Sequence, residues 1–379
     1  MSPKSRLWRV YVLPAAVFQS VMIGGGYGTG REIVEYFTRF GVQGGLLGLG
    51  LVTACFAVLL GVSYEFARVY RAYDYRRFFR ELLGRAWIAF ELLYLAMFAL
   101  VLAVIAAAAG KLFEEHLHWP AALGMGLLLL AVTLLAFYGR QWVMRILALK
   151  AVLLSAVFLV YFIVIASSAS VQILSEVGRG EALEGWMGGA LRYVLYSSVV
   201  VPAMLFASAS IETRREALIS GVVGAVVGIL PGVLLHLSFA AGYPQVLQQA
   251  IPANWMISQL GIPALTLAYL IVLFGCLLDT GLRFIQSVNE RLEGWRLESQ
   301  REPIARPVRA GIAILCVLVS GGLSYFGVVN LIGRGYGTMA WGFLVLYVAP
   351  LLTVGVYRLV RRNPAFAIDP VKPASQSVR

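Results

Sequence analysis

Long apolar runs separated by short polar segments dominate the pattern of this 379-residue chain. A helix of about 20 apolar residues crosses the hydrocarbon core of a bilayer. By this criterion the pattern predicts about ten membrane-spanning helices, at residues 10–38, 43–69, 87–112, 120–138, 142–168, 188–209, 217–241, 262–284, 308–331 and 337–360. The chain is therefore predicted to be an all-α, multi-pass membrane protein.

Glycine interrupts the first of these apolar runs. The interruption consists of Gly24, Gly25, Gly26, Tyr27, Gly28, Thr29 and Gly30. Because each glycine in a helix interior costs about 1 kcal/mol relative to alanine, this stretch predicts two half-helices separated by unwound backbone. Secondary transporters use such unwound backbone to bind a solute near the bilayer midplane. The alternative is a glycine patch that lets continuous helices pack closely.

Ten spans divide into two groups of five, and an odd number per group makes the second group inverted. Residues 1–168 would form the first repeat, 169–362 the second, and 363–379 a disordered cytoplasmic tail. Span 6 then corresponds to span 1, and it carries a second interruption shortly before Pro202. The residues of this interruption are Tyr193, Tyr196, Ser197 and Ser198. Interruptions in corresponding spans indicate a substrate site.

The positions of the charged residues predict the topology. The chain is 60% hydrophobic and 13% charged, whereas a soluble domain carries about 25% charged residues. A net charge of +12 would suit a nucleic-acid partner, but most of the 31 Lys and Arg residues lie in alternate short connections between apolar runs. This bias predicts both termini on the cytoplasmic side of the cytoplasmic (inner) membrane, with the lipid bilayer and not nucleic acid as partner.

Composition and motifs indicate neither an enzyme nor a cofactor. Cys55, Cys276 and Cys316 are isolated within apolar runs and have no metal-ligand or redox spacing. The sequence contains no zinc-binding helix motif and no nucleotide-binding loop. We therefore expect no metal, no cofactor and no catalytic residue.

Two connections on the outer side differ in character. Residues 242–261 contain Pro244, Pro252 and Trp255, a composition that suits short helices packed as a lid over the entrance. Residues 171–184 are polar, and we expect a flexible connection there.

Ten spans with breaks in spans 1 and 6 resemble the LeuT fold of the amino acid–polyamine–organocation superfamily. Residues 22–33 resemble more narrowly the YkvI-like membrane proteins, in which a Gly-x-Gly-aromatic-x-Ser/Thr-Gly-x-Glu pattern opens the chain. The resemblance implies a LeuT-like 5+5 inverted repeat and a transport function, but no particular substrate. The chain departs from the family pattern in span 6, where Ser197 and Ser198 replace an Asn.

The same resemblance implies a coupling site. In LeuT-fold sodium symporters, span 1 carbonyls and span 8 hydroxyls bind sodium, and in sodium-independent relatives a span 5 lysine reaches that place. Lys150 resembles this lysine by position, and Asp279 and Thr280 fall at the span 8 positions. We expect the Lys150 ammonium, partnered by Asp279, to occupy the sodium site. The alternatives are a static ion pair that braces the two spans, and a lysine that extends to the inner interface.

Glu32 begins the outer half-helix of span 1, where the helix dipole favours a carboxylate. It is either an ordinary cap, or a group that binds a substrate amine or a proton. Arg192 is its expected partner in an outer gate. The glycines, with Tyr27, Tyr193 and Tyr196 as aromatic walls, suit a small zwitterion or amine.

We therefore expect a secondary active transporter of an amino acid or a related zwitterion or amine, sodium-independent or proton-coupled. The alternatives are a sodium-coupled symporter of the same fold, a membrane sensor or receptor that does not transport, and a channel. The sequence does not distinguish between them.

Overall fold

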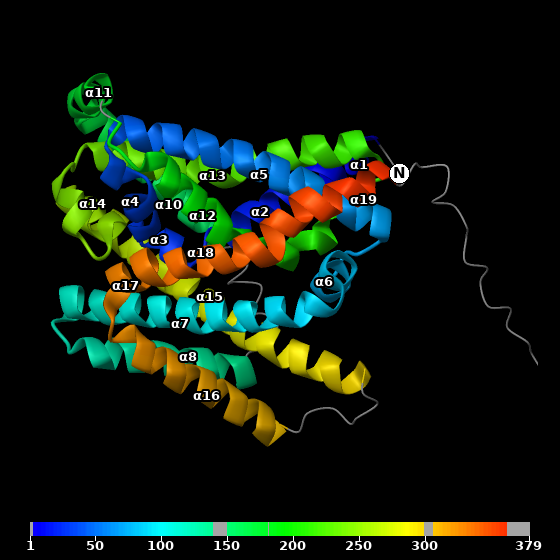
Figure 1. Ribbon diagram of the computed structural model, residues 1–379. Helices are drawn as coiled ribbons and strands as arrows, with labels where there is room; N and C mark the ends of the chain where they lie inside the picture. Colours follow the sequence, from blue (N-terminus) through cyan, green and yellow to red (C-terminus); the bar gives the residue numbers. More distant parts are fainter. Residues whose placement is uncertain (1–2, 139–149, 181, 299–305, 362–379) are drawn as a thin grey trace, which may run out of the picture.

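The computed structural model describes residues 3–138, 150–180, 182–298 and 306–361, and every regular element in this part of the chain is a helix (Figure 1). The first half contains α1 (Pro3–Leu7), η1 (Trp8–Val12), α2 (Leu13–Met22), α3 (Gly25–Gly28), α4 (Arg31–Tyr36), η2 (Thr38–Phe40), α5 (Val42–Tyr70), α6 (Tyr75–Leu83), η3 (Gly84–Ala86), α7 (Trp87–Leu117), α8 (Ala121–Tyr138), α10 (Lys150–Ser168) and α11 (Ser170–Gly178). The second half contains α12 (Trp186–Ser197), η4 (Ser198–Val200), η5 (Pro202–Ser208), α13 (Arg214–Ala240), η6 (Gln245–Gln248), α14 (Pro252–Gln259), α15 (Pro263–Glu298), α16 (Arg306–Ser324), α17 (Gly327–Asn330), η7 (Leu331–Tyr336), α18 (Gly337–Phe343), η8 (Leu344–Val348), η9 (Leu351–Gly355) and α19 (Val356–Arg361).

The helices correspond to the expected spans. Five helical stretches of the described residues are long and apolar enough to cross a membrane, and seven if two bent helix pairs are counted. The other expected spans are the broken first run and the shorter apolar helices within α8 and α16. Residues 142–149 of the fifth expected span and the expected tail at 363–379 lie outside the described residues.

The two bent pairs mark positions where a helix changes direction. The axis turns by 65° between Trp186–Val200 and Pro202–Ser208, because Pro202 has no N–H to continue the helix. It turns by 86° between Leu153–Ser168 and α11. The expectation of a flexible connection at 171–184 is wrong for its first half. There α11 exposes Val171 and Leu174, as a helix that lies along a membrane surface does.

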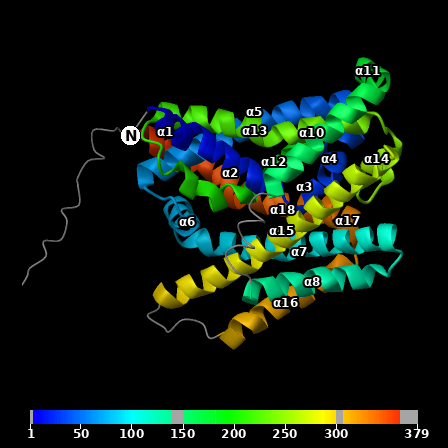
Figure 2. The ribbon, with the colours of Figure 1, turned by 180° about the vertical axis from the view of Figure 1, so that it is seen from behind.

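The long helices form two groups. In the first group α13 packs along α5 and α2, and α12 packs on α5. In the second group α7, α8, α15 and α16 pack against one another, which Figures 1 and 2 show as a separate layer. Small residues bring helices together within the first group: a methyl group placed on Gly221 would lie 2.5 Å from the backbone nitrogen of Gly61. The short helix α3 contacts both α7 and α15, so the break in span 1 lies where the two groups meet.

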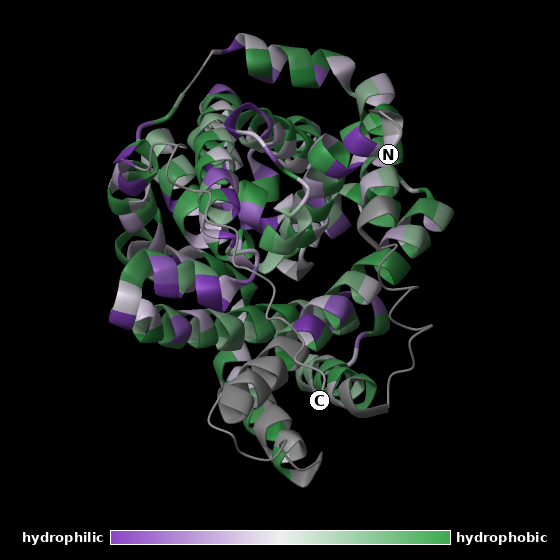
Figure 3. Cartoon of the chain, turned by 90° about the vertical axis from the view of Figure 1, so that its right-hand side faces the viewer, coloured by the Kyte–Doolittle hydropathy of each residue, from purple (hydrophilic) through white to green (hydrophobic). Residues whose placement is uncertain are grey.

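The two ends of the bundle differ in charge and in the short helices that lie over them. The helices α1, α6 and α19 lie at one end, and α4, α11 and α14 at the other (Figure 1). Seen from the end that carries α1 and α19, hydrophilic colours gather on segments that face the viewer (Figure 3). The positive-inside rule predicts that this end is the cytoplasmic one and that α14, at the opposite end, lies on the outer side.

Candidate functional site

Span 1 is broken twice, on either side of a single helical turn. The helix α2 ends at Met22, and Ile23 leaves the helical conformation with a ψ of 74°. After α3 the chain turns at Gly30, whose φ of +77° lies in the left-handed region that favours glycine. The Thr29 hydroxyl braces this turn: it donates to the Gly26 carbonyl oxygen at 2.6 Å and accepts from the Arg31 backbone N–H at 3.2 Å. The expected interruption is present, although α3 divides it.

Span 8, which is the first part of α15, runs along this break. The Tyr269 hydroxyl donates to the carbonyl oxygen of Gly28 at 3.0 Å. A methyl group on Gly24 would lie 3.9 Å from Oγ1 of Thr280, so this hydroxyl faces the inner half of the break. Thr280 Oγ1 itself donates to the Cys276 carbonyl oxygen at 2.7 Å. The structure therefore brings Thr280 to the segment with which the sequence associated it.

Asp279 is completely buried beside Thr280. Its Oδ2 atom accepts a hydrogen bond from Nε of Arg283 at 2.8 Å, one helical turn farther along α15. Lys150 is the first described residue of α10, and its side chain lies outside the part of the chain that the structure describes. The ion pair of Lys150 with Asp279 therefore stays a prediction, and Arg283 is an additional partner that the sequence analysis missed.

Glu32, on the outer side of the break, contacts span 6. Its Oε2 atom accepts a hydrogen bond from the Tyr196 hydroxyl at 2.9 Å, and a methyl group on Gly26 would overlap its Oε1 atom. The expected contact with Arg192 is not among the ion pairs of the described residues. Arg192 lies one turn, about 5.4 Å, farther toward the outer end of α12 and is exposed. Arg192 thus lies outside the packed interior, whereas Tyr196 is buried and reaches Glu32.

The second break lies a few residues later than the sequence suggested. Tyr193 and Tyr196 are buried within α12, and Ser197 and Ser198 are buried at its end. The Ser198 hydroxyl donates to the Leu195 carbonyl oxygen at 2.6 Å, inside its own helix. The bend follows at Pro202. Among the described residues, the side-chain hydrogen bonds and ring contacts from span 6 to span 1 come from the tyrosines: Tyr196 donates to Glu32, and the Tyr193 ring packs on Phe37.

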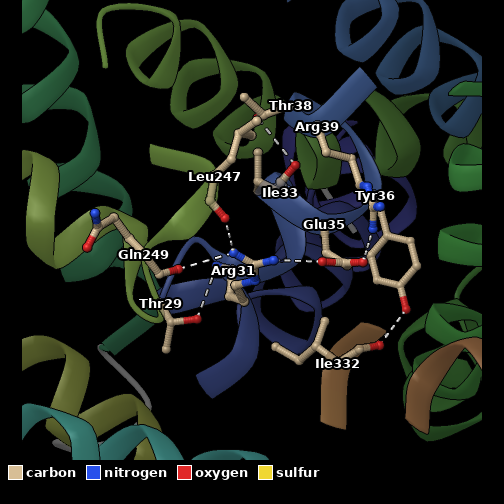
Figure 4. Close-up of polar contacts among 10 residues, drawn as sticks. All are labelled: Thr29, Arg31, Ile33, Glu35, Tyr36, Thr38, Arg39, Leu247, Gln249 and Ile332. Atoms are coloured by element: carbon tan, nitrogen blue, oxygen red, sulfur yellow. Dashed lines mark hydrogen bonds and ion pairs between the residues drawn. The ribbon is translucent and has the colours of Figure 1, made fainter. Parts of the chain in front are cut away.

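The outer connection folds over the break, as expected of a lid. Arg31, which the sequence analysis did not single out, is buried and holds the lid in place (Figure 4). Its Nη1 atom donates to the carbonyl oxygens of Leu247 at 2.8 Å and Gln249 at 3.1 Å, and its Nη2 atom donates to Glu35 at 2.7 Å. A charged residue inside an apolar run was the signal that could have identified Arg31.

The lid also contacts the second helix group. Its Ala253 backbone N–H donates to the Thr29 carbonyl oxygen at 3.1 Å, on the span 1 side. On the span 3 side, Asn254 Nδ2 donates to Glu115 at 2.9 Å, and Asn254 Oδ1 lies 3.0 Å from Nε2 of His116. The lid therefore bridges both groups and closes the outer end of the break.

Comparisons with known proteins agree with this architecture. No family model matches the chain. It is 30% identical over 276 residues to the Bacillus subtilis (strain 168) protein YkvI, described as an uncharacterized membrane protein; the match covers 69% of this chain and 75% of that protein. A manganese transporter from Eremococcus coleocola, solved with an aromatic bis-isothiourea compound, superposes with a TM-score of 0.59 at 16% identity over 93% of this chain and 80% of that one. Two variants of that transporter superpose with a TM-score of 0.57. At this identity the likeness shows the fold alone, which is the expected LeuT-like fold.

Proposed function

Because this chain belongs to the same family as the membrane protein YkvI and has a LeuT-like fold, we propose that it is a secondary active transporter of a small solute that works by alternating access. The observation that carries the proposal is the pair of broken spans. Spans 1 and 6 are both interrupted, and the break in span 1 lies where the two helix groups meet. Broken helices at such an interface expose backbone groups to a solute in the middle of the membrane.

The substrate we propose is an amino acid or a related zwitterion or amine. The break combines backbone free of side chains at Gly24 and Gly26 with the buried rings of Tyr27, Tyr193 and Tyr196. The transporters with a similar fold carry manganese. However, the described residues contain no group of three or more His, Cys, Asp or Glu side chains that could hold a metal ion. An organic solute therefore fits this chain better than a divalent metal ion.

The conformation supports alternating access. Thr29 is fully buried and Tyr27 is 1% exposed, and the lid contacts Thr29 through the backbone N–H of Ala253. The outer path is thus closed, and a solute from outside reaches the break only after the lid contacts of Arg31 and Asn254 open. These contacts join the two helix groups, so relative movement of the groups would break them.

We propose further that transport is sodium-independent or proton-coupled. The support is the position of Thr280 beside Gly24, the buried carboxylate of Asp279, and Lys150 in α10. A lysine charge at this place would substitute for a bound sodium ion. The alternatives remain a sodium-coupled symporter and a sensor that binds a ligand without transport.

The test is a thermal-shift screen of the purified protein, followed by counterflow in liposomes. Amino acids, amines and nucleobases are added with and without sodium at two pH values, since a ligand of the folded state raises its apparent stability. We expect a hit without sodium, and exchange of the labelled hit across the liposome membrane. A hit that requires sodium would contradict the coupling proposal, and binding without counterflow would indicate a sensor. An unsaturable current would indicate a channel.

A further inference from the structure

Glu32 is a buried carboxylate with no cation beside it among the described residues. Glu32 is only 8% exposed, and the one hydrogen bond that the described residues make to its side chain comes from the neutral Tyr196 hydroxyl. The nearest arginine in sequence, Arg31, donates instead to the lid and to Glu35. Arg192 is exposed. Burying an unpaired charge is costly, so a carboxylate at this place calls for a positively charged ligand or a proton.

Tyrosine rings gather around Tyr196, whose hydroxyl donates to this carboxylate. The Tyr196 ring centroid lies 5.1 Å from that of Tyr36, 5.4 Å from that of Tyr193 and 4.9 Å from that of Tyr336. Aromatic faces attract cations, and ammonium groups with organic substituents are recognised in this way.

One side of the carboxylate is free of side chains. Its Oε1 atom lies against Gly26, where any Cβ would overlap it. Glycine there keeps the carboxylate in contact with the span 1 break. The Tyr27 hydroxyl, in the next residue of the break, is buried and has no hydrogen-bond partner among the described residues. The Glu32 carboxylate thus lies directly against the backbone of the break at Gly26.

We propose that Glu32 and the surrounding tyrosines bind the ammonium group of an organic amine substrate. The carboxylate pairs with the charge, and the rings of Tyr36, Tyr193, Tyr196 and Tyr336 pack against the carbon substituents. This inference rests on the proposed function, because it places the ligand at the break that the transporter would use. It also narrows the proposed substrate class to molecules that carry a positively charged nitrogen.

The test compares ligands that differ in charge and not in size. Propylammonium, propionamide and propionate, together with the amino acids that hit the screen, are titrated at constant ionic strength against the full chain in detergent or nanodiscs. We expect binding of propylammonium and of the amino-bearing hits, and no measurable binding of propionate. Glu32→Gln keeps the shape and removes the charge, so it should weaken ammonium binding by about 10- to 100-fold. The matched control is Glu114→Gln, which removes an exposed carboxylate paired with Lys111 and should bind like the unaltered protein.

Tyr196→Phe keeps the ring and removes the hydrogen bond, so it tests the site independently if Glu32→Gln does not fold. It should weaken ammonium binding by severalfold, and it should lower the melting temperature only as far as the loss of one hydrogen bond to a buried carboxylate requires, in a protein that still folds. Equal affinity in both variants would overturn the assignment of Glu32, as would preferential binding of the neutral or anionic compounds, while the transport proposal would stand. Retained binding in Glu32→Gln with a lost pH dependence of transport would make Glu32 a proton site and also overturn it. Failure of every compound to bind, combined with absence of counterflow, would contradict the transport function itself.

Discussion

Arg31 donates a hydrogen bond from Nη1 to the carbonyl oxygen of Leu247 at 2.8 Å, across 216 positions of sequence (Figure 4). The bond joins the first residue after the span 1 break to the lid over it. The same guanidinium group donates to the carbonyl oxygen of Gln249 and to the Glu35 carboxylate. One buried side chain therefore connects the half-helix α4 to the lid. Arg31 is therefore the main side chain that keeps the outer end closed on the side of the first helix group.

Arg31→Ala should open the outer end. Hydrogen bonds to charged groups contribute about 1.5–3 kcal/mol each, and losing those to Leu247 and Gln249 should raise the population of the outward-open state about tenfold or more. The measurement is labelling of a cysteine placed at Ser197, in a background without Cys55, Cys276 and Cys316, by a membrane-impermeant thiol reagent added outside.

The control for this prediction is Arg334→Ala, which removes an exposed arginine elsewhere on the outer side. It should leave the labelling rate unchanged. Equal labelling in the Arg31 and Arg334 variants would show that Arg31 does not hold the lid.

Valine at Gly26 or Gly28 should abolish ligand binding in a folded protein. A side chain at Gly26 overlaps the Glu32 carboxylate, and a methyl group at Gly28 would lie 3.0 Å from Leu273 and 3.3 Å from Leu154. Binding is followed by the ligand-induced rise in melting temperature. Gly50→Val is the matched control, because a Cβ there meets nothing within 4 Å. Normal affinity in both break variants would rule out a ligand site at the break.

Gly221→Ala should destabilise the fold without touching the site. Its methyl group would lie 2.5 Å from the Gly61 nitrogen and 2.9 Å from the Ala57 carbonyl oxygen, which are backbone atoms that cannot move aside cheaply. Overpacking of this kind costs about 1–3 kcal/mol, so the melting temperature should fall. Gly126→Ala, where a Cβ meets nothing within 4 Å, should leave it unchanged or raise it. A similar melting temperature for both variants would contradict the close approach of α5 and α13.

Lys150→Ala should remove the pH dependence of transport and leave folding intact, if the lysine takes the place of sodium and carries the proton. The measurement is the initial rate of uptake into liposomes between pH 5 and pH 9. Lys111→Ala, which removes an exposed lysine paired with Glu114, is the control and should keep the profile of the unaltered protein. An unchanged profile in Lys150→Ala would leave the lysine a structural role only.

The sequence alone determined most of the architecture. Apolar runs long enough to span a bilayer, the glycines at 24–30 and the residues around Pro202 are local features, and their effects on hydration, helix propensity and hydrogen bonding act within one or two turns. The all-α, multi-pass fold with broken spans 1 and 6 therefore follows from short stretches of residues. Even so, the left-handed turn at Gly30 and the helix α11 were not anticipated, since the neighbouring backbone decides where a break or bend is taken up.

Only the tertiary structure decided which side chains meet. Glu32 was paired with Arg192 from charge, yet its partner is Tyr196, because α12 places the tyrosine at the buried level of Glu32 and leaves the arginine on the exposed surface of the bundle. The contacts of Arg31 with the lid were not recognised, because their acceptors are carbonyl oxygens that every residue possesses and that come within reach only where the lid folds. Contacts between residues more than 150 positions apart depend on helix packing and on the depth of each residue in the bundle. No local pattern of polarity or spacing contains that information.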